Sequence, residues 1–185
     1  MSKNIALIGS GNAFFKDEGI GLYGAKYLKE RYSFTPDVEI VDGGTLGFKL
    51  MPLLQEFDEV IIINTASDDD GVIGEITIKT TDEFLDGSLV KKTANEVEIA
   101  EMLQICSLSE LMANTTVVSI VPKDIISVDV SLSDELKDSW QNYIDTTLDI
   151  LKSLDVKVDI KNDSITLDDI VDIFANPSIE HCRGF

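Results

Sequence analysis

Four short segments rich in apolar and β-branched residues constrain the fold of this chain more than any other feature. They span residues 4–9, 37–42, 59–64 and 115–121, and the first three run directly into glycine-rich or polar stretches. Short runs that end in such loops are typical of buried parallel strands. Helical segments lie between them, and alternating strand and helix units close right-handed into a mostly parallel sheet.

Helical periodicity marks the segments between and after these strands. Apolar residues recur at near-helical spacing over residues 18–31, 46–54, 95–106 and 134–154. Pro52 requires the second helix to begin late or to kink, and Ser133 is expected to cap the last one. Residues 74–80 alternate apolar and polar side chains, which predicts an edge strand with one face in water.

These patterns predict a three-layer α/β domain over residues 1–155, in which a mostly parallel, twisted sheet is flanked by helices. Residues 156–185 form an acidic C-terminal extension, with a short strand-like piece and a helix near residues 167–174. Apolar residues such as Ile170 and Phe174 recur in this extension. We therefore expect it to dock on the domain.

Charge and composition exclude several classes of function. The chain has 185 residues, of which 34 are acidic and 15 basic, and its formal net charge is −19. This charge repels phosphate backbones and anionic lipids, so neither nucleic acid nor a membrane surface is an expected partner. The longest apolar stretch, residues 60–63, is far short of the about 20 residues that a membrane span needs, and a cytoplasmic protein is expected. The spacing of Cys106 and Cys182 indicates neither a disulfide framework nor a zinc knuckle, so free thiols are expected.

The loop after the first strand, residues 9–21, is the first place to seek a ligand site, because ligands bind beyond the carboxyl ends of parallel strands. The loop is glycine-rich, but Phe14 occupies the position of the third glycine in a dinucleotide fingerprint. Asp17 and Glu18 would also repel a phosphate at the start of the following helix. A nucleotide or generic small-ligand site is therefore the least favoured function.

Asp17 and Glu18 form a carboxylate pair at the expected start of the first helix. One interpretation is that the pair complements the helix dipole and caps the helix. The other is that one carboxylate points along the strand ends as a metal ligand or an acid–base group. Flanking glycines leave space for another chain to approach, which favours the second interpretation.

Two motifs in these loops resemble a known family. Gly-x-Gly-Asn, four further residues and Asp-Glu-Gly-x-Gly occupy residues 9–21, and Val-Asp-Gly-Gly-Thr-Leu-Gly occupies residues 41–47. Both resemble the hydrogenase maturation endopeptidases, which trim the C-terminal tail of the nickel-iron hydrogenase large subunit. The resemblance continues in order through residues 60–63, 118–122 and 131–133. It covers about residues 4–154 and implies a hydrolase with a phosphorylase/hydrolase-like α/β fold.

The resemblance also implies three positions that face the nickel of the unprocessed substrate. The family has a Glu after the first strand, an Asp after the third strand and a His at the start of a later helix. In this chain these positions are Glu18, Asn64 and Asn95. Nickel and zinc favour imidazole and carboxylate, whereas an amide oxygen is a weak ligand. The two amides therefore predict a much weaker transition-metal site.

Other ligating side chains lie elsewhere in the sequence. His181, the single histidine, stands between Glu180 and Cys182, and it reaches the site only if the tail folds back across the strand ends. The alternative for these residues is a solvated or frayed terminus. Residues 68–70 are three consecutive aspartates that could supply oxygen ligands or form a solvated loop.

By resemblance, the chain is an endopeptidase that cleaves the C-terminal extension of a nickel-loaded large-subunit precursor, which would be its partner. Nickel is expected to arrive with the substrate, and no cofactor of the chain's own is expected. The expected groove for the substrate tail is formed by Gly9, Gly11, Asn12, Asp17, Asp42, Gly43, Gly44 and Thr45. The alternative is a non-catalytic paralogue that acts as a hydrogenase assembly or binding factor, because Asn64 and Asn95 replace two ligands.

Overall fold

A five-stranded sheet in the order β3-β1-β4-β6-β5 forms the centre of the protein. The computed structural model describes residues 3–66, 71–86, 93–108 and 112–177. Four strands run parallel: β1 (Ile5–Ser10), β3 (Val38–Gly44), β4 (Glu59–Thr65) and β6 (Asn114–Ile120). β5 (Ile76–Thr80) pairs antiparallel with β6 at the edge. The mostly parallel sheet and the edge strand are thus confirmed.

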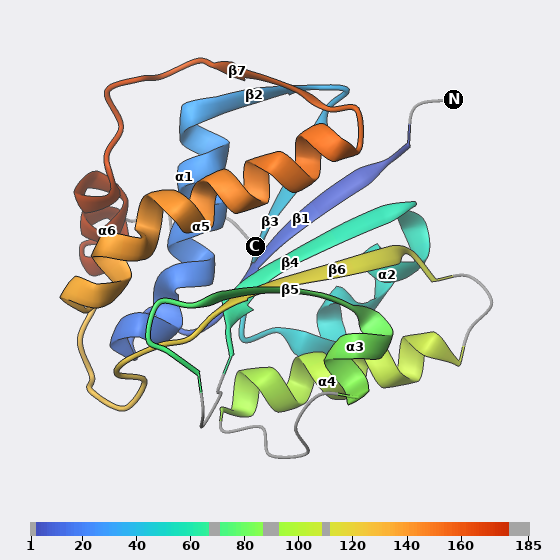
Figure 1. Cartoon of the computed structure of the whole chain (residues 1–185), viewed down its shortest axis with the longest axis horizontal. Coiled ribbons are helices and arrows are strands. Elements are labelled where there is room, and N and C mark those ends of the chain that lie inside the picture. The colour runs from blue at the N-terminus through green and yellow to red at the C-terminus, as the bar shows by residue number, and fades with distance from the viewer. Residues whose placement is uncertain (1–2, 67–70, 87–92, 109–111, 178–185) are drawn as a thin grey trace.

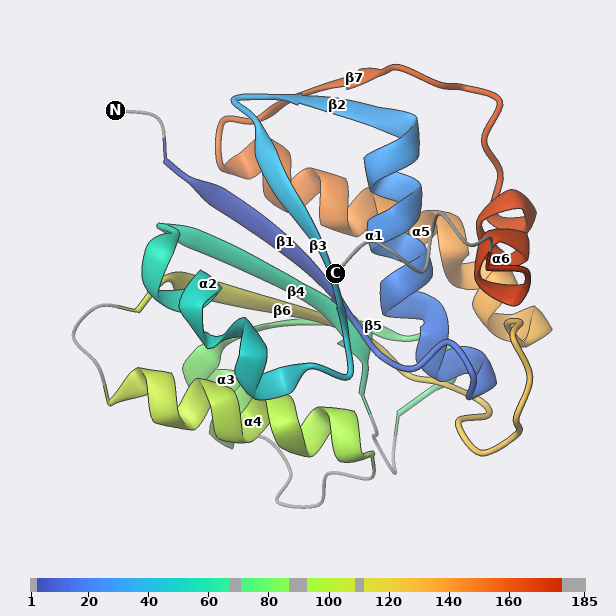
Figure 2. The ribbon, with the colours of Figure 1, turned by 180° about the vertical axis from the view of Figure 1, so that it is seen from behind.

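Helices cover both faces of this sheet (Figures 1 and 2). One face carries α1 (Ile20–Arg31), α5 (Asp134–Ser153) and α6 (Leu167–Ala175), and the other carries α2 (Met51–Glu56), α3 (Thr81–Asp86) and α4 (Ala94–Ser107). Alternate residues of β1 divide between the two cores, because successive side chains of a strand point to opposite faces. The three-layer α/β architecture is therefore confirmed. No helix within the described residues has the length and apolar character to cross a membrane.

Burial explains why two strands could be recognised so readily from their composition. Every residue of β1 and β4 is buried, since both strands lie inside the sheet and under helices on both faces. A strand in this position has no solvated face, so its sequence is a nearly continuous apolar run.

The structure shows how three of the helices begin. A short 3-10 segment, η1 (Lys16–Gly19), comes before α1, so the first regular helix begins at Ile20. A second one, η2 (Gly47–Leu50), comes before α2, which has Pro52 in its first turn and so begins late, as expected. Ser133 is the N-cap residue of α5, but the expected capping bond is absent. Its hydroxyl donates instead to Asp17, 2.8 Å away.

The described residues beyond 155, residues 156–177, dock on the domain, as expected. β7 (Lys157–Ile160) pairs antiparallel with β2 (Tyr32–Thr35) in a separate two-stranded sheet. α6 packs on α1, where the rings of Phe174 and Tyr23 meet edge to face with 5.1 Å between centroids. Ile170 of α6 is fully buried in the same core. The boundary between domain and extension at residue 155 stays a prediction.

The carboxyl ends of the four parallel strands meet at one edge of the sheet. The loops that follow β1, β3, β4 and β6 leave the sheet there, and α4 begins there, since Asn95 contacts Ser10 at the end of β1. This is the edge at which parallel α/β sheets bind ligands.

Candidate functional site

The first loop lies so close to the strand ends that side chains do not fit at several glycines. A Cβ at Gly9 would lie 2.4 Å from the carbonyl oxygen of Gly21, and one at Gly21 would lie 2.3 Å from the carbonyl oxygen of Ser10. Gly11 has a φ of +149° and its Cβ would lie 2.0 Å from the carbonyl oxygen of Glu18. The space around these glycines is thus taken by the chain's own backbone. The expectation that the glycines leave room for another chain was wrong at Gly9 and Gly21.

Glu18 faces a cavity of about 410 Å³ at this edge. It lies in η1 and is only 7% exposed. Burial raises the pKa of its carboxyl group, and the nearby Glu96 raises it further, whereas a hydrogen bond from Thr93 opposes these effects. The other residues that line the cavity are Asn12, Phe15, Thr45, Thr93, Asn95, Glu98, Ile125 and Ile126.

Asn95 lines the same cavity from the first turn of α4. Thr93 caps this helix in a reciprocal capping box with Glu96, which fixes where the helix begins and therefore where Asn95 lies. The side-chain oxygen of Asn95 accepts a hydrogen bond of 2.9 Å from the hydroxyl of Ser10. Two residues that are 77 positions apart, Glu18 and Asn95, are thus brought together.

Asn64 lies near the end of β4 and is completely buried. Its side-chain oxygen accepts a 2.7 Å hydrogen bond from the hydroxyl of Ser119, and its backbone carbonyl accepts one from Tyr143. Gly9, which precedes Ser10, pairs in register with Ile63, which precedes Asn64, so Asn64 occupies the same edge. It does not line the cavity that Glu18 and Asn95 share.

Asp17 has a different environment from its neighbour Glu18. It is fully buried, and its carboxylate accepts hydrogen bonds from the backbone N–H groups of Lys123, Asp124 and Ser133 and from the Ser133 hydroxyl, at 2.6–3.0 Å. These bonds hold the loop over residues 121–133 against η1. Asp17 is therefore a structural anchor for this loop and does not line the Glu18 cavity.

Comparison with known proteins decides the family. The sequence model of the family described as hydrogenase maturation protease matches residues 23–150. This chain belongs to the hydrogenase maturation protease family. Protein HydD of Wolinella succinogenes is 30% identical over 146 residues, which are 77% of this chain and 91% of that protein.

Two further comparisons agree with this membership. The hydrogenase 2 maturation protease of Escherichia coli strain K12 is 27% identical over 122 residues, which are 65% of this chain and 74% of that protein. The solved structure of the hydrogenase maturating endopeptidase HybD from E. coli has a TM-score of 0.77 and 23% identity, covering 87% of this chain and 99% of that chain. The fold is thus that of the hydrogenase maturation endopeptidases, a class of hydrolases.

This hydrogenase maturation protease does not present a donor set that fits a resident nickel or zinc ion. The side-chain oxygens of Asn64 and Asn95 already accept hydrogen bonds from serine hydroxyls, and their Nδ2 atoms have no partner among the described residues. An amide N–H donates and cannot ligate a cation. No group of three or more His, Cys, Asp or Glu side chains suited to a metal occurs within the described part of the chain. His181, Glu180, Cys182 and residues 68–70 lie outside the described residues.

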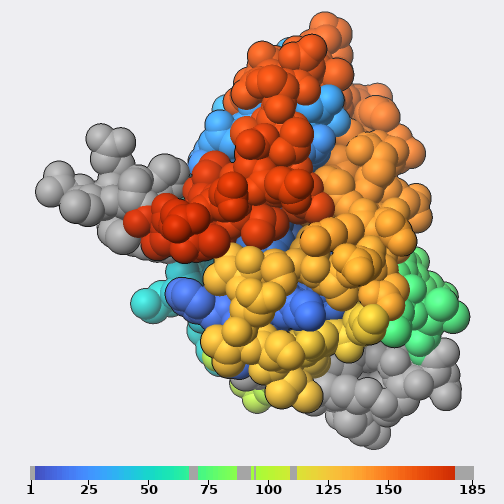
Figure 3. Space-filling model, turned by 90° about the vertical axis from the view of Figure 1, so that its left-hand side faces the viewer, coloured from blue at the N-terminus to red at the C-terminus, as the bar shows by residue number. Residues whose placement is uncertain are grey.

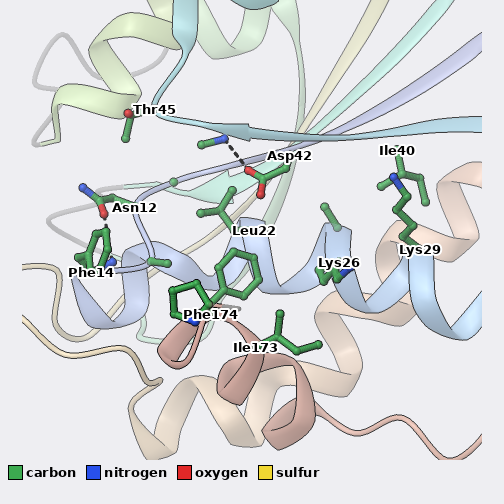
Figure 4. Close-up of a pocket in the computed structure, with 15 residues that line it drawn as sticks. Asn12, Phe14, Leu22, Lys26, Lys29, Ile40, Asp42, Thr45, Ile173 and Phe174 are labelled. Atoms are coloured by element: carbon green, nitrogen blue, oxygen red, sulfur yellow. Dashed lines mark hydrogen bonds between the residues drawn. The ribbon is translucent and has the colours of Figure 1, made fainter. Parts of the chain in front are cut away.

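A second hollow, of about 520 Å³, lies beside the cavity (Figure 4). Of the residues expected to form a groove, Gly11, Asn12, Asp42, Gly44 and Thr45 line it. Gly9 and Gly43 do not line it. Gly9 is packed against Gly21, and a Cβ at Gly43 would lie 2.7 Å from the Ile8 side chain. Asn12 and Thr45 line both hollows, so the larger hollow, here called the groove, adjoins the Glu18 cavity.

The groove has polar and apolar sides. Burial raises the pKa of Asp42, while a hydrogen bond from the backbone N–H of Gly44 and the charges of Lys26 and Lys29 oppose this. Both lysines line the groove from α1. Figure 4 shows Asp42 on one side of the groove and Phe174 of α6 on the other.

The sequence patterns did not indicate several residues of the site. Ile173 and Phe174 give the groove a wall that lies beyond residue 150, where the family match ends. Thr93 and Glu98 line the cavity from the start of α4. The capping box formed by Thr93 and Glu96 was a readable signal for this helix start, whereas nothing in the sequence connects α6 with the first loop.

Proposed function

We propose that this protein is an endopeptidase that removes the C-terminal extension of a nickel-loaded nickel-iron hydrogenase large-subunit precursor. Maturation proteases act on hydrogenase large-subunit precursors, and the chain belongs to that family. The observation that carries the proposal is the shared cavity of Glu18 and Asn95, which adjoins the groove at Asn12 and Thr45. These are two of the three positions at which the family resemblance implies contact with the substrate's nickel. The cytoplasm, where the proposal places this reaction, stays a prediction.

The groove suits an extended peptide. A peptide rises about 3.3 Å per residue when extended, so two adjoining hollows accommodate several residues of a chain end. Leu22, Ile40 and Phe174 would contact apolar side chains of the extension, while Asp42 and Lys26 offer polar contacts. We propose that the scissile bond lies at the Glu18 cavity and that the extension beyond it follows the groove.

In the proposed reaction a water oxygen adds to the scissile carbonyl carbon, the C–N bond breaks and the leaving amine takes a proton. The nickel belongs to the substrate, where it polarises the carbonyl or a bound water. Glu18 ligates that nickel through its carboxylate and so positions the precursor. Burial favours the neutral form of the Glu18 carboxyl group. The positive charge of the substrate's metal acts in the opposite direction and stabilises the ionised form.

The test is to mix the purified protein with a nickel-loaded precursor and to detect the shortened chain by mass spectrometry. The wild type is expected to remove the extension, and Glu18→Gln is expected to remove little or none. Glu101→Gln, an exposed carboxylate on α4, serves as the matched control and should cleave like the wild type. Absence of cleavage by the wild type would favour the non-catalytic paralogue, and cleavage by Glu18→Gln would remove Glu18 from the mechanism.

A further inference from the structure

The loop over residues 121–133 exposes apolar side chains although its backbone is held in place. Ile126 is 83% exposed and Val128 is 79% exposed. Phe14, from the loop after β1, is 65% exposed and lies beside them, because the backbone N–H of Asp129 donates to the carbonyl of Phe14 at 3.0 Å. We call Phe14, Ile126 and Val128 the apolar rim.

Hydrogen bonds fix the position of this rim. The buried carboxylate of Asp17 accepts from the backbone on both sides of Ile126 and Val128, at Lys123 and Asp124 and again at Ser133. Within the loop, the Asp124 carboxylate accepts from the backbone N–H of Ile126 at 3.1 Å. Lys16 donates from its backbone to the carbonyl of Asp129. The loop is thus organised before any partner binds, and its apolar side chains are held in water.

The rim borders both the Glu18 cavity and the groove. Ile126 lines the Glu18 cavity, and Phe14 lines the neighbouring hollow. Figure 3 shows this face, where the loop over residues 121–133 (yellow) lies around the surface of the first loop (blue). A polypeptide whose end enters the groove would therefore place its adjoining surface on the rim.

Two lysines near the rim are paired within the chain, and Asp129, next to Val128, accepts a hydrogen bond from the Ser131 hydroxyl. Lys16 pairs with Asp124 at 3.6 Å, and Lys123 pairs with Glu135 at 2.5 Å. The rim itself offers a partner apolar side chains to bury, and a few buried side chains at the centre of an interface supply much of its binding energy.

We propose that the apolar rim docks on an apolar patch of the folded body of the precursor, next to the point at which its extension begins. This inference rests on the proposed function, since the groove defines which polypeptide covers the rim. The rim would thus recognise the folded protein, while the groove would bind the extension.

The test compares the double variant Ile126→Ser/Val128→Ser with the wild type on a nickel-loaded precursor. The expected result is a KM at least about tenfold higher, because about 1.4 kcal/mol of lost contact is tenfold in affinity. Val128→Ser alone, a side chain that lines neither hollow, should raise KM with kcat at saturation unchanged. Both side chains are exposed, so the melting temperature should not change. If the double variant does melt lower, the two single substitutions provide the same comparison.

Leu108→Ser is the matched control. Leu108 is 86% exposed, but it lies at the end of α4 farthest from Asn95, at the opposite edge of the sheet. Its KM should stay within about twofold of the wild type, as expected for a surface substitution away from the interface. An unchanged KM for the double variant, or an equal rise for Leu108→Ser, would overturn the docking proposal while cleavage by the wild type still supports the proposed function. If the wild type does not cleave, the proposed function fails, and direct binding of the precursor to each variant then decides the docking proposal.

Discussion

The buried carboxylate of Asp17 is expected to be the group on which the geometry of the site loop depends most. It accepts four hydrogen bonds, three from backbone N–H groups and one from the Ser133 hydroxyl. Each hydrogen bond contributes about 1 kcal/mol net to stability, so Asp17→Ala should lower the free energy of unfolding by about 4 kcal/mol. That is a large part of the about 5–15 kcal/mol by which a typical domain is stable.

Asp17→Asn separates the contribution of the individual oxygens. Oδ2 accepts three of the four bonds, and an amide oxygen in that position would keep them. The amide nitrogen would then face the backbone N–H of Ser133, which donates to Oδ1 at 2.6 Å in the wild type. One donor would lose its acceptor, so a loss of about 1–3 kcal/mol is expected, smaller than for alanine.

Urea unfolding followed by circular dichroism measures these differences, with equal m-values required for the comparison. Asp138→Asn, an exposed aspartate on α5, is the control and should stay within about 0.5 kcal/mol of the wild type. Hydrogen exchange should also become faster at the amides of Lys123, Asp124 and Ser133 in Asp17→Ala. A loss below about 1 kcal/mol in that variant, with unchanged exchange, would refute the role given to Asp17.

Two further predictions concern the cavity. Burial raises the pKa of Glu18 in the folded protein above its value in the unfolded chain. Below the unfolded pKa this carboxyl group therefore makes its full contribution to the stability of the folded state. That contribution is lost as the pH rises through the folded pKa. Glu18→Gln should therefore be more stable than the wild type at pH 7, with the advantage shrinking in acid, and urea titrations at several pH values would show the reverse trend if the reasoning fails. The double variant Asn64→Asp/Asn95→His should gain Ni²⁺ binding in equilibrium dialysis relative to the wild type, because carboxylate and imidazole replace two amides whose oxygens accept from Ser119 and Ser10. Equal Ni²⁺ binding by both proteins would show that the amides do not limit metal affinity.

The sheet could be predicted from the sequence because its strands carry local signals. β1 and β4 are buried on both faces, and this requires continuous apolar runs that end where the loops begin. β2 carries no such signal: it follows α1 without an intervening turn, and its partner β7 lies more than 120 positions away. α3 has only six residues, which is too short for a helical period to show.

The site was only partly readable for a similar reason. Asp17 and Glu18 are adjacent carboxylates, and apart from the family resemblance, which singles out Glu18, the sequence offers no ground for giving them different roles. Asp17 is bound by backbone groups more than 100 positions away, and a backbone N–H leaves no trace in the identity of the residue that carries it. Glu18 meets Asn95 only because the end of β1 lies beside the start of α4.

The unpaired polar atoms at this edge argue that the edge serves binding rather than stability. Within the described residues, five buried side-chain N or O atoms have no hydrogen-bond partner, and three of them belong to Asn64, Thr65 and Asn95. Each such atom costs about 1–3 kcal/mol, and the buried Glu18 adds the cost of a carboxylate whose ionised form is disfavoured. Of the three residues, Asn95 lines the Glu18 cavity, where its Nδ2 is available to a bound substrate, and local violations of this kind are expected at functional sites.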